Sequence, residues 1–210
     1  MIRVVVSDDH AIVRKGMVQI ASASGEIEIR GEAGEYTALM RLLRTEDCDV
    51  LLLDIAMPGK NGIDVLKIVR EQYPKIRVLI LSMYPEDQYA IRALKAGASG
   101  YLTKDSAPER LVDAILAVAR GKKYITPRVA EMLATHLTTD SEGAPHEALS
   151  DREFQTLRMI ASGKQLSQIA DELSLSPKTV SVYRARVLEK MQLKNNAELT
   201  HYAIKNGLAD

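Results

Sequence analysis

Cysteine is nearly absent from this chain of 210 residues, because Cys48 is the only one. A single cysteine excludes an intramolecular disulfide and a zinc site built from several cysteines. Cys48 precedes an apolar run, so we expect a small core residue rather than a nucleophile.

Long apolar runs are also missing, and no stretch approaches the ~20 residues of a membrane-spanning helix. The N-terminus enters Ile2–Val6 and then two aspartates, which is too short and too soon charged for a signal peptide. We therefore expect a soluble cytoplasmic protein that has no membrane partner.

Charge of one sign is not in excess, since 28 Lys and Arg residues balance 28 Asp and Glu residues. The total charge therefore predicts neither a nucleic-acid binder nor a membrane-surface protein. From Leu149 onward, however, nine basic residues stand against seven acidic ones. This mild asymmetry is a hint about the C-terminal region and no more.

The first half alternates apolar runs with amphipathic stretches. Continuous apolar strands separated by helices are typical of a parallel sheet covered on both faces. We expect an α/β fold with a doubly wound five-stranded parallel sheet, whose strands are predicted by Val4–Val6, Ile27–Arg30, Val50–Leu53, Val78–Leu81 and Gly100–Leu102. The helices are predicted at Val13–Ala21, Thr37–Leu43, Ile63–Val69, Tyr89–Leu94 and Leu111–Ala119.

Polar side chains follow several of these strands. Asp8 and Asp9 come after the first, and Asp54 comes after the third. The ends of adjacent parallel strands converge at one edge of the sheet, and carboxylates that meet there repel unless a cation neutralises them. A hard divalent ion, Mg²⁺ above all, suits such oxygen ligands. Taken singly, each aspartate could instead cap the helix that follows it.

Two further residues weaken that simpler interpretation. Ser82 ends the fourth strand and Lys104 lies just past the fifth. A lysine at this edge can pair with a phosphoryl oxygen, and a serine hydroxyl can hydrogen-bond another. Together the five groups describe a carboxylate that accepts a phosphoryl group, with a metal ion and a lysine spreading its charge.

These residues make 1–121 resemble a receiver domain of two-component signalling, with a flavodoxin-like fold. The matching pieces are Ser7–His10, Asp54–Gly59 with Gly62, Ser82, and Gly97–Lys104. The resemblance implies that Asp54 is the phosphoacceptor. It also implies Mg²⁺ bound directly by Asp9, Asp54 and the backbone carbonyl of Ala56, and through water by Asp8.

The same resemblance places Ser82 and Tyr101 on the family's switch pair and Lys104 on its lysine position. Tyr101 could equally be an ordinary amphipathic aromatic, with its ring packed and its hydroxyl in water. The small Ala56 leaves the approach to Asp54 open, whereas Tyr84 could partly cover it.

The alternation of strands and helices stops near Gly121. Pro127 opens a predicted linker helix, and the polar, turn-rich stretch from Thr138 to Pro145 predicts a flexible linker. From Leu149 to the end we expect about four helices and no strand. The predicted domains are 1–121, a linker over 122–147, and a small all-α domain over 148–210.

Two helix starts stand out in this last region. Ser150 and Glu153 fit a capping box, while Ser176 followed by Pro177 marks another helix start. On a helical wheel of about 100° per residue, Val180, Val187 and Met191 share one face of this later helix. Lys178, Val182, Ala185 and Arg186 point away from that face, with Ser181 on its flank.

Small and basic outward residues suit a helix that enters the DNA major groove. A solvated face of an ordinary bundle helix is the alternative for the basic residues, but solubility does not require the small ones. The segments Leu149–Glu153, Ile169–Ala170 and Ser176–Arg184 resemble the LuxR-type helix-turn-helix. That resemblance implies base contacts by Ser181, Val182 and Ala185. It implies phosphate contacts by Thr179, Tyr183, Arg186 and Lys194, with Lys178 close by.

Across nearly its whole length the chain resembles NarL/FixJ-type response regulators, and Ser176–Val180 is especially similar to the GacA/UvrY and BvgA branch. The resemblance implies a sensor histidine kinase or phosphotransfer protein as donor, double-stranded DNA as target, and a homodimer after phosphorylation. It implies a regulator that is not an enzyme, apart from catalysing its own phosphotransfer and dephosphorylation.

Two other functional classes share part of this pattern. Haloacid-dehalogenase-type phosphatases also use an aspartate nucleophile and Mg²⁺, but they keep a second aspartate two residues later, where this chain has Ala56 and no cap domain. A receiver-like interaction module that is never phosphorylated usually loses one of the acidic or lysine positions. This chain keeps them all.

Overall fold

The computed structural model describes residues 1–57, 60–138 and 144–209, and the side chains of 136–138 are left undescribed. Pro58 and Gly59 of the receiver motif, and residues 139–143 of the predicted flexible linker, lie outside the described residues. The chain divides into two compact units, Met1–His136 and Leu137–Asp210.

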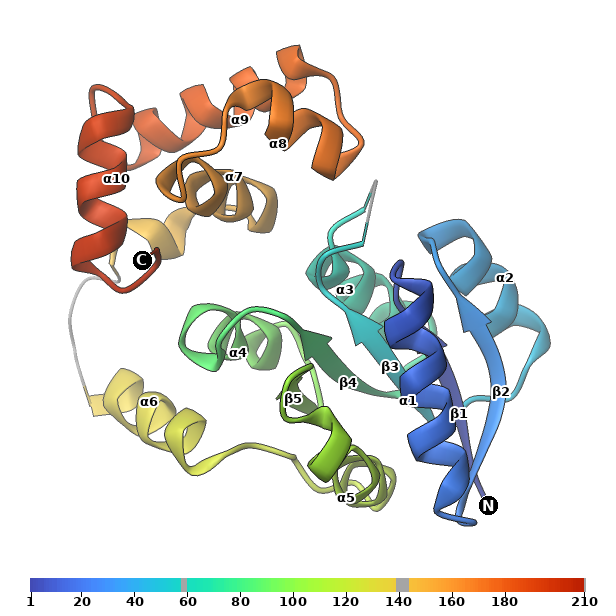
Figure 1. Cartoon of the computed structure of the whole chain (residues 1–210). Helices are drawn as coiled ribbons and strands as arrows, with labels where there is room; N and C mark the ends of the chain where they lie inside the picture. The colour runs from blue at the N-terminus through green and yellow to red at the C-terminus, as the bar shows by residue number, and fades with distance from the viewer. Residues whose placement is uncertain (58–59, 139–143, 210) are drawn as a thin grey trace. The chain divides into compact units, whose positions relative to one another are not determined.

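The first unit is built on a five-stranded parallel sheet with the order β2-β1-β3-β4-β5, as Figure 1 shows. This is the flavodoxin-like order, and it confirms the predicted fold. The strands are β1 (Ile2–Ser7), β2 (Ile27–Ala33), β3 (Val50–Asp54), β4 (Arg77–Ser82) and β5 (Gly100–Thr103).

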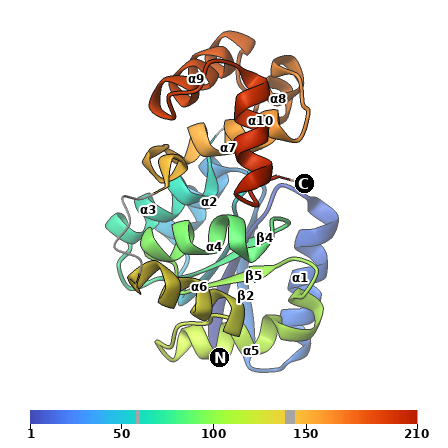
Figure 2. The same ribbon diagram turned by 90° about the vertical axis from the view of Figure 1, so that its left-hand side faces the viewer.

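The helices between the strands cover both faces of the sheet (Figures 1 and 2). They are α1 (Ala11–Ala23), α2 (Tyr36–Thr45), α3 (Gly62–Gln72), α4 (Glu86–Lys95) and α5 (Ala107–Ala119), and α6 (Pro127–Thr138) follows in the predicted linker. Every residue of β3 is buried. Because a central parallel strand is covered on both faces, its sequence is continuously apolar rather than alternating.

One core cluster lies between the sheet, α1 and α5, where Val4 and Val6 pack with Met17 and Leu111. Val5 is equally buried but is absent from this cluster, since successive side chains of a strand point to opposite faces. Cys48 is half-buried just before β3, and burial raises the pKa of its thiol to about 12. The thiol is therefore protonated near neutral pH, as expected of a cysteine that is no nucleophile.

The second unit contains a short 3₁₀ turn, η1 (Pro145–Ala148), and the four expected helices. These are α7 (Asp151–Ala161), α8 (Leu166–Leu173), α9 (Pro177–Lys190) and α10 (Asn196–Lys205). The predicted capping box is present, because Ser150 accepts from Glu153 N and the Glu153 side chain accepts from Ser150 N. None of the helices in the described part of the chain combines the length and apolar character needed to cross a membrane.

Candidate functional site: an acidic phosphoacceptor cluster and an exposed helix

The acidic residues meet at the carboxyl edge of the sheet. Strands β1 and β3 are neighbours, with Ser7 opposite Leu53, so the residues that follow them emerge side by side. Asp8 and Asp54 are each 1% exposed, while the Asp9 side chain is 26% exposed. The structure thus brings together the three carboxylates that the sequence placed at one edge.

Lys104 lies between two of these carboxylates. Its Nζ atom is 2.8 Å from Asp54 Oδ2 and 2.7 Å from Asp8 Oδ2. Burial raises the pKa of Asp54, although the ammonium opposes that shift. Burial by itself would lower the pKa of Lys104, but Asp54 and Asp8 together outweigh it and the pKa is raised. The lysine therefore stays charged among buried carboxylates.

The cluster can also hold a metal ion. One ligand atom from each of Asp8, Asp9, His10 and Asp54 lies within 4.8 Å of the others. Asp8 Oδ2 and Asp9 Oδ1 are buried without a well-aligned hydrogen bond, although Lys104 and His10 lie within ion-pair distance of them. Oxygen atoms left without hydrogen bonds in an acidic pocket are the ligands that hard divalent cations take.

His10 is a member of this cluster that the sequence analysis did not assign. Its Nδ1 atom is 2.9 Å from Asp9 Oδ1 and 3.5 Å from Asp8 Oδ1. Its backbone N–H donates to Asp8 Oδ1 at 2.8 Å, which fixes that carboxylate. Its place directly after Asp9 was the only signal in the sequence.

The loop after β3 returns tightly beneath the phosphoacceptor candidate. Asn61 caps α3 by accepting from Ile63 N, and Gly62 follows it. A Cβ atom at Gly62 would lie 2.2 Å from the backbone oxygen of Asp54. Only glycine lets the helix start so close to the strand end, which explains its place in the motif.

Ser82 and Tyr101 are both fully buried, and both contact the backbone of Tyr84. The Tyr101 hydroxyl donates to Tyr84 O at 2.8 Å, and Ser82 Oγ accepts from Tyr84 N at 3.0 Å. The alternative of a tyrosine whose hydroxyl sits in water is therefore wrong for this structure. The main chain of Tyr84 thus joins the two switch candidates, and a side chain of Tyr84 that partly covers Asp54 stays a prediction.

In the second unit, α8 and α9 form a helix-turn-helix. Ser174 turns the chain with φ of 53°, and Ser176 caps α9 by accepting from Thr179 N. Ile169, Ala170 and Leu173 are buried on α8, as are Val180 and Val187 on α9 and Met191 after it. These are the faces that the sequence predicted.

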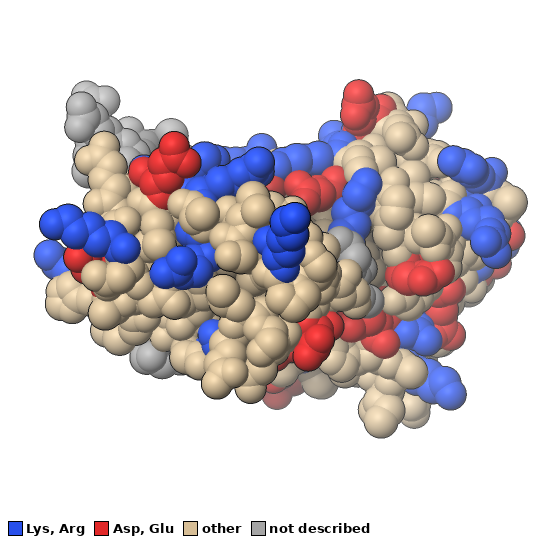
Figure 3. All heavy atoms as spheres, turned by 90° about the horizontal axis from the view of Figure 1, so that it is seen from above, with Lys and Arg blue, Asp and Glu red and all other residues tan. Residues whose placement is uncertain are grey.

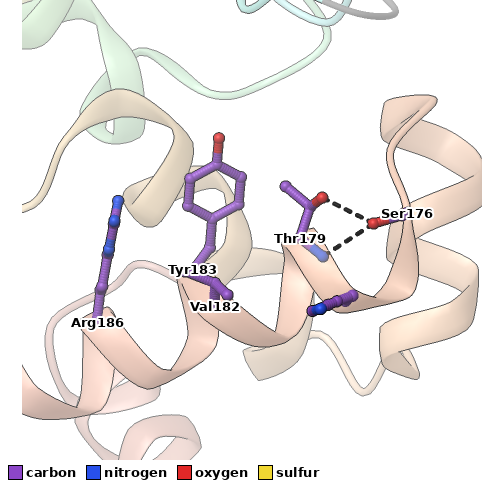
Figure 4. Close-up of a pocket in the computed structure, with 6 residues that line it drawn as sticks. Ser176, Thr179, Val182, Tyr183 and Arg186 are labelled. Carbon is purple, nitrogen blue, oxygen red and sulfur yellow. Dashed lines mark hydrogen bonds between the residues drawn. The ribbon is translucent and has the colours of Figure 1, made fainter.

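The opposite face of α9 is open. Lys178, Ser181, Ala185 and Arg186 are exposed, and Val182 is 43% exposed although it is apolar. Thr179, Tyr183 and Arg186 project from one side of the helix (Figure 4). They line a shallow hollow of about 360 Å³ together with Ser176, Lys178 and Val182.

Lys and Arg side chains lie among Asp and Glu side chains on the face of the molecule that Figure 3 shows. In the described residues, neither Lys178 nor Arg186 is ion-paired with a carboxylate. Lys194 is exposed just after α9. Arg184 differs, because its Nε atom donates to Asn196 Oδ1 at 2.6 Å. Arg184 therefore ties α9 to α10, a role that the sequence analysis missed.

Comparisons with known proteins identify two separate family matches in the chain. Residues 4–116 match the family model described as the response regulator receiver domain. Residues 147–203 match the model for bacterial regulatory proteins of the luxR family. The first match alone covers more than half of the chain.

Similar proteins cover both parts together. The chain is 35% identical to response regulator UvrY of Escherichia coli (strain K12), covering 100% of this chain and 97% of that protein. It is 36% identical to response regulator GacA of Pseudomonas aeruginosa, covering 100% and 99%.

Solved structures of RcsB are similar as well. One from Salmonella typhimurium has a TM-score of 0.71 and 26% identity, covering 98% of each chain. Another, a complex of the two-component response regulator RcsB with DNA, has a TM-score of 0.61 and 28% identity, covering 97% and 98%. The chain therefore belongs to the two-component response regulators that join a receiver domain to a LuxR-family regulatory domain.

Proposed function

We propose that this response regulator is phosphorylated on Asp54 and that phosphorylation controls its dimerisation and its sequence-specific binding to DNA. The observation that carries the proposal is the position of Asp54, which is buried 2.8 Å from Lys104 at the edge shared with Asp8. A nucleophilic carboxylate beside a fixed ammonium and a metal-binding pocket suits the acceptance of a phosphoryl group. The donor is a sensor histidine kinase or a phosphotransfer protein.

Mg²⁺ fits the site because the carboxylates supply hard oxygen ligands. Asp9, Asp54 and the Ala56 carbonyl would hold it directly, and Asp8 through water. When bound, the ion neutralises charge on the phosphoryl oxygens. An Asp54 oxygen forms the new bond to phosphorus as the donor's bond to phosphorus breaks, and the bonding electrons leave with the donor. Lys104 then pairs with one phosphoryl oxygen, and Ser82 donates to another.

This chemistry changes the protein itself and turns over no other substrate. The chain is thus a regulator whose only catalysis is its own phosphotransfer and dephosphorylation. We assign the receiver to 1–121, the linker to 122–147 and the DNA-binding domain to 148–210. Because DNA is the proposed partner, we place the protein in the cytoplasm.

For DNA binding, α9 is the element that enters the major groove. Ser181, Val182 and Ala185 are small and exposed, so they allow close approach to base edges. Thr179, Tyr183, Arg186 and Lys194, with Lys178 beside them, hold phosphates. A homodimer binds two half-sites, and the second half-site then binds at a high effective concentration. Structures of RcsB bound to promoter DNA in the presence of the phosphomimetic BeF3-, and of two RcsB dimers bound to two parallel DNAs, support this proposal.

A small phosphodonor with Mg²⁺ tests the proposal directly. Intact-mass measurement of the full chain should show one stable phosphoryl adduct, and Asp54→Asn should show none. Asp113→Asn, at an exposed position on α5, is the matched control and should be labelled like wild type. Continuous release of phosphate without an adduct would instead support a phosphatase. An unlabelled wild type would support an interaction module.

A further inference from the structure

A buried hydrogen bond joins the two chain segments that carry the carboxylates of the acidic site. Ser7 is the last residue of β1, and its hydroxyl donates to Met57 Sδ at 3.2 Å. Both residues are 1% exposed, so water does not compete for this contact. The bond therefore connects the end of β1, which leads into Asp8, with the segment that follows Asp54 at the end of β3.

A hydroxyl is unexpected at this position of the strand. The preceding residues Val4–Val6 are fully buried and apolar, and Ser7 lies between Ala33 of β2 and Leu53 of β3 in the sheet. Burial of a hydroxyl is unfavourable unless the group is hydrogen-bonded. The thioether of Met57 supplies an acceptor, although a weak one. Each of the two side chains therefore restricts the position of the other.

Met57 also belongs to the segment that would supply the backbone ligand of Mg²⁺. The Ala56 N–H donates to Asp54 Oδ1 at 3.2 Å, and Gly62 N donates to Ile55 O at 2.9 Å. The carbonyl oxygen of Ala56 lies in the planar peptide group that joins Ala56 to Met57. Because the side chain of Met57 is buried and hydrogen-bonded, its position limits the direction of that oxygen.

We propose that Ser7 is a positioning residue for Mg²⁺ binding, because its hydroxyl holds the Met57 side chain and thereby fixes the direction of the Ala56 carbonyl oxygen. This inference rests on the proposed Mg²⁺ site and on the proposed phosphorylation of Asp54. Ser7 and Met57 act through the Ala56 peptide group and do not bind the ion themselves. A carbonyl group that is already held loses little conformational freedom when the ion binds, so the contact raises the affinity for Mg²⁺.

Titration of the unphosphorylated full chain with Mg²⁺, followed by NMR amide signals, measures this affinity without any turnover. Ser7→Ala should weaken Mg²⁺ binding about tenfold, the lower end of the range for groups that orient metal ligands, because a thioether is a weak acceptor. Met57→Leu removes the acceptor at similar volume and should have a similar effect. The double variant should lose no more affinity than either single variant, since both remove the same contact.

Labelling by a small phosphodonor at several Mg²⁺ concentrations separates positioning from a general packing defect. Ser7→Ala should raise the Mg²⁺ concentration for half-maximal labelling about tenfold. The loss of labelling rate should be smaller at saturating Mg²⁺, because the bound ion then orders the carbonyl group itself. A rate that falls by the same factor at every Mg²⁺ concentration would assign Ser7 to packing and overturn the inference.

The matched control is Ser99→Ala with Met40→Leu. Ser99 is buried directly before β5, at the opposite end of the strands from the acidic site, and Met40 is buried on α2. The same two chemical changes are thus made at buried positions away from the acidic site. This control should bind Mg²⁺ like wild type, and an equal loss of affinity in the control would overturn the inference.

Two other results separate the inference from the proposed function. A Ser7→Ala protein that binds Mg²⁺ like wild type would overturn the inference alone, as would single-variant effects that multiply in the double variant. A wild type that neither binds Mg²⁺ nor is labelled on Asp54 would overturn the proposed function and the inference with it.

Discussion

The acidic site and helix α9 differ in whether their charged side chains are buried or exposed. Asp54 and Asp8 are buried and share the ammonium of Lys104, whereas Lys178 and Arg186 are exposed, without a carboxylate partner among the described residues. Buried charges need partners or protonation, because desolvation costs them several kcal/mol each. Exposed cations need none in water and are available for phosphates. The charges of the acidic site are therefore stabilised by neighbouring groups of opposite sign. The cations of α9 are stabilised by water and stay accessible to a binding partner.

Substitution of Lys104 is expected to have the largest effect on stability and on phosphorylation. Lys104→Met leaves two carboxylates buried without their cation, so we expect about 3 kcal/mol lower stability without Mg²⁺ and phosphorylation slowed about 100-fold. Mg²⁺ should restore part of the stability. Urea unfolding with and without Mg²⁺, and phosphodonor labelling, measure these effects. Lys122→Met, an exposed change, is the control, and equal losses in both variants would contradict the special role of Lys104.

A second test concerns the backbone under Asp54. Gly62→Ala places a methyl group 2.2 Å from the Asp54 carbonyl oxygen, so we expect a loss of at least about 2 kcal/mol of stability. Gly16→Ala in α1 meets nothing within 4 Å and should stabilise the protein by roughly 0.5–1 kcal/mol. Urea midpoints of the two variants should move in opposite directions. A Gly62→Ala protein as stable as wild type would show that the loop has room to relax.

Substitutions on the exposed face of α9 should change the affinity for DNA and leave the folding stability nearly unchanged. Arg186→Ala should weaken binding to all DNA sequences and reduce the slope of log affinity against log salt by about 1, with stability changed by less than about 0.5 kcal/mol. Val182→Thr should instead alter which sequence is preferred. Competition binding over several salt concentrations separates the two effects. A Val182 variant that keeps the relative affinities of different sites would argue against insertion into the groove.

The smallest expected effect is at Glu153. Burial acts to raise its pKa, but hydrogen bonds from Lys190 and Ser150 outweigh this and the pKa is lowered. A lowered carboxyl pKa contributes stability above the unfolded value near 4.3, and that stability is lost as the pH falls through the folded value. Glu153→Gln keeps a side chain that can complete the capping box but removes the charged partner of Lys190, so we expect a cost of about 1 kcal/mol at neutral pH and less at low pH.

Urea unfolding of the full chain at several pH values, followed by NMR amide signals from α7–α10, measures this. Asp171→Asn, exposed on α8, serves as the control. A Glu153→Gln penalty that is the same at every pH would show that the capping box does not depend on the carboxylate charge.

The sequence by itself determined the order of strands and helices, because apolar runs and caps act locally. The apolar run Val50–Leu53 predicted a buried strand followed by a carboxylate, and Ser176–Pro177 predicted a helix start, and β3 and α9 are found there. It also determined that Asp8, Asp9, Asp54 and Lys104 would meet, since parallel strands end at a common edge.

Only the tertiary structure decided which atoms pair across that edge and where the switch residues connect. His10 joins the cluster through its position at the start of α1, and Tyr101 reaches Tyr84 and Tyr124 rather than water. Arg184 donates a hydrogen bond from Nε to Asn196 Oδ1 and so connects α9 to α10. These contacts join residues that local periodicity does not relate, because their side-chain directions are set by packing between elements. The chemical groups of these side chains follow from the sequence, whereas the atoms that they contact are determined by the tertiary structure.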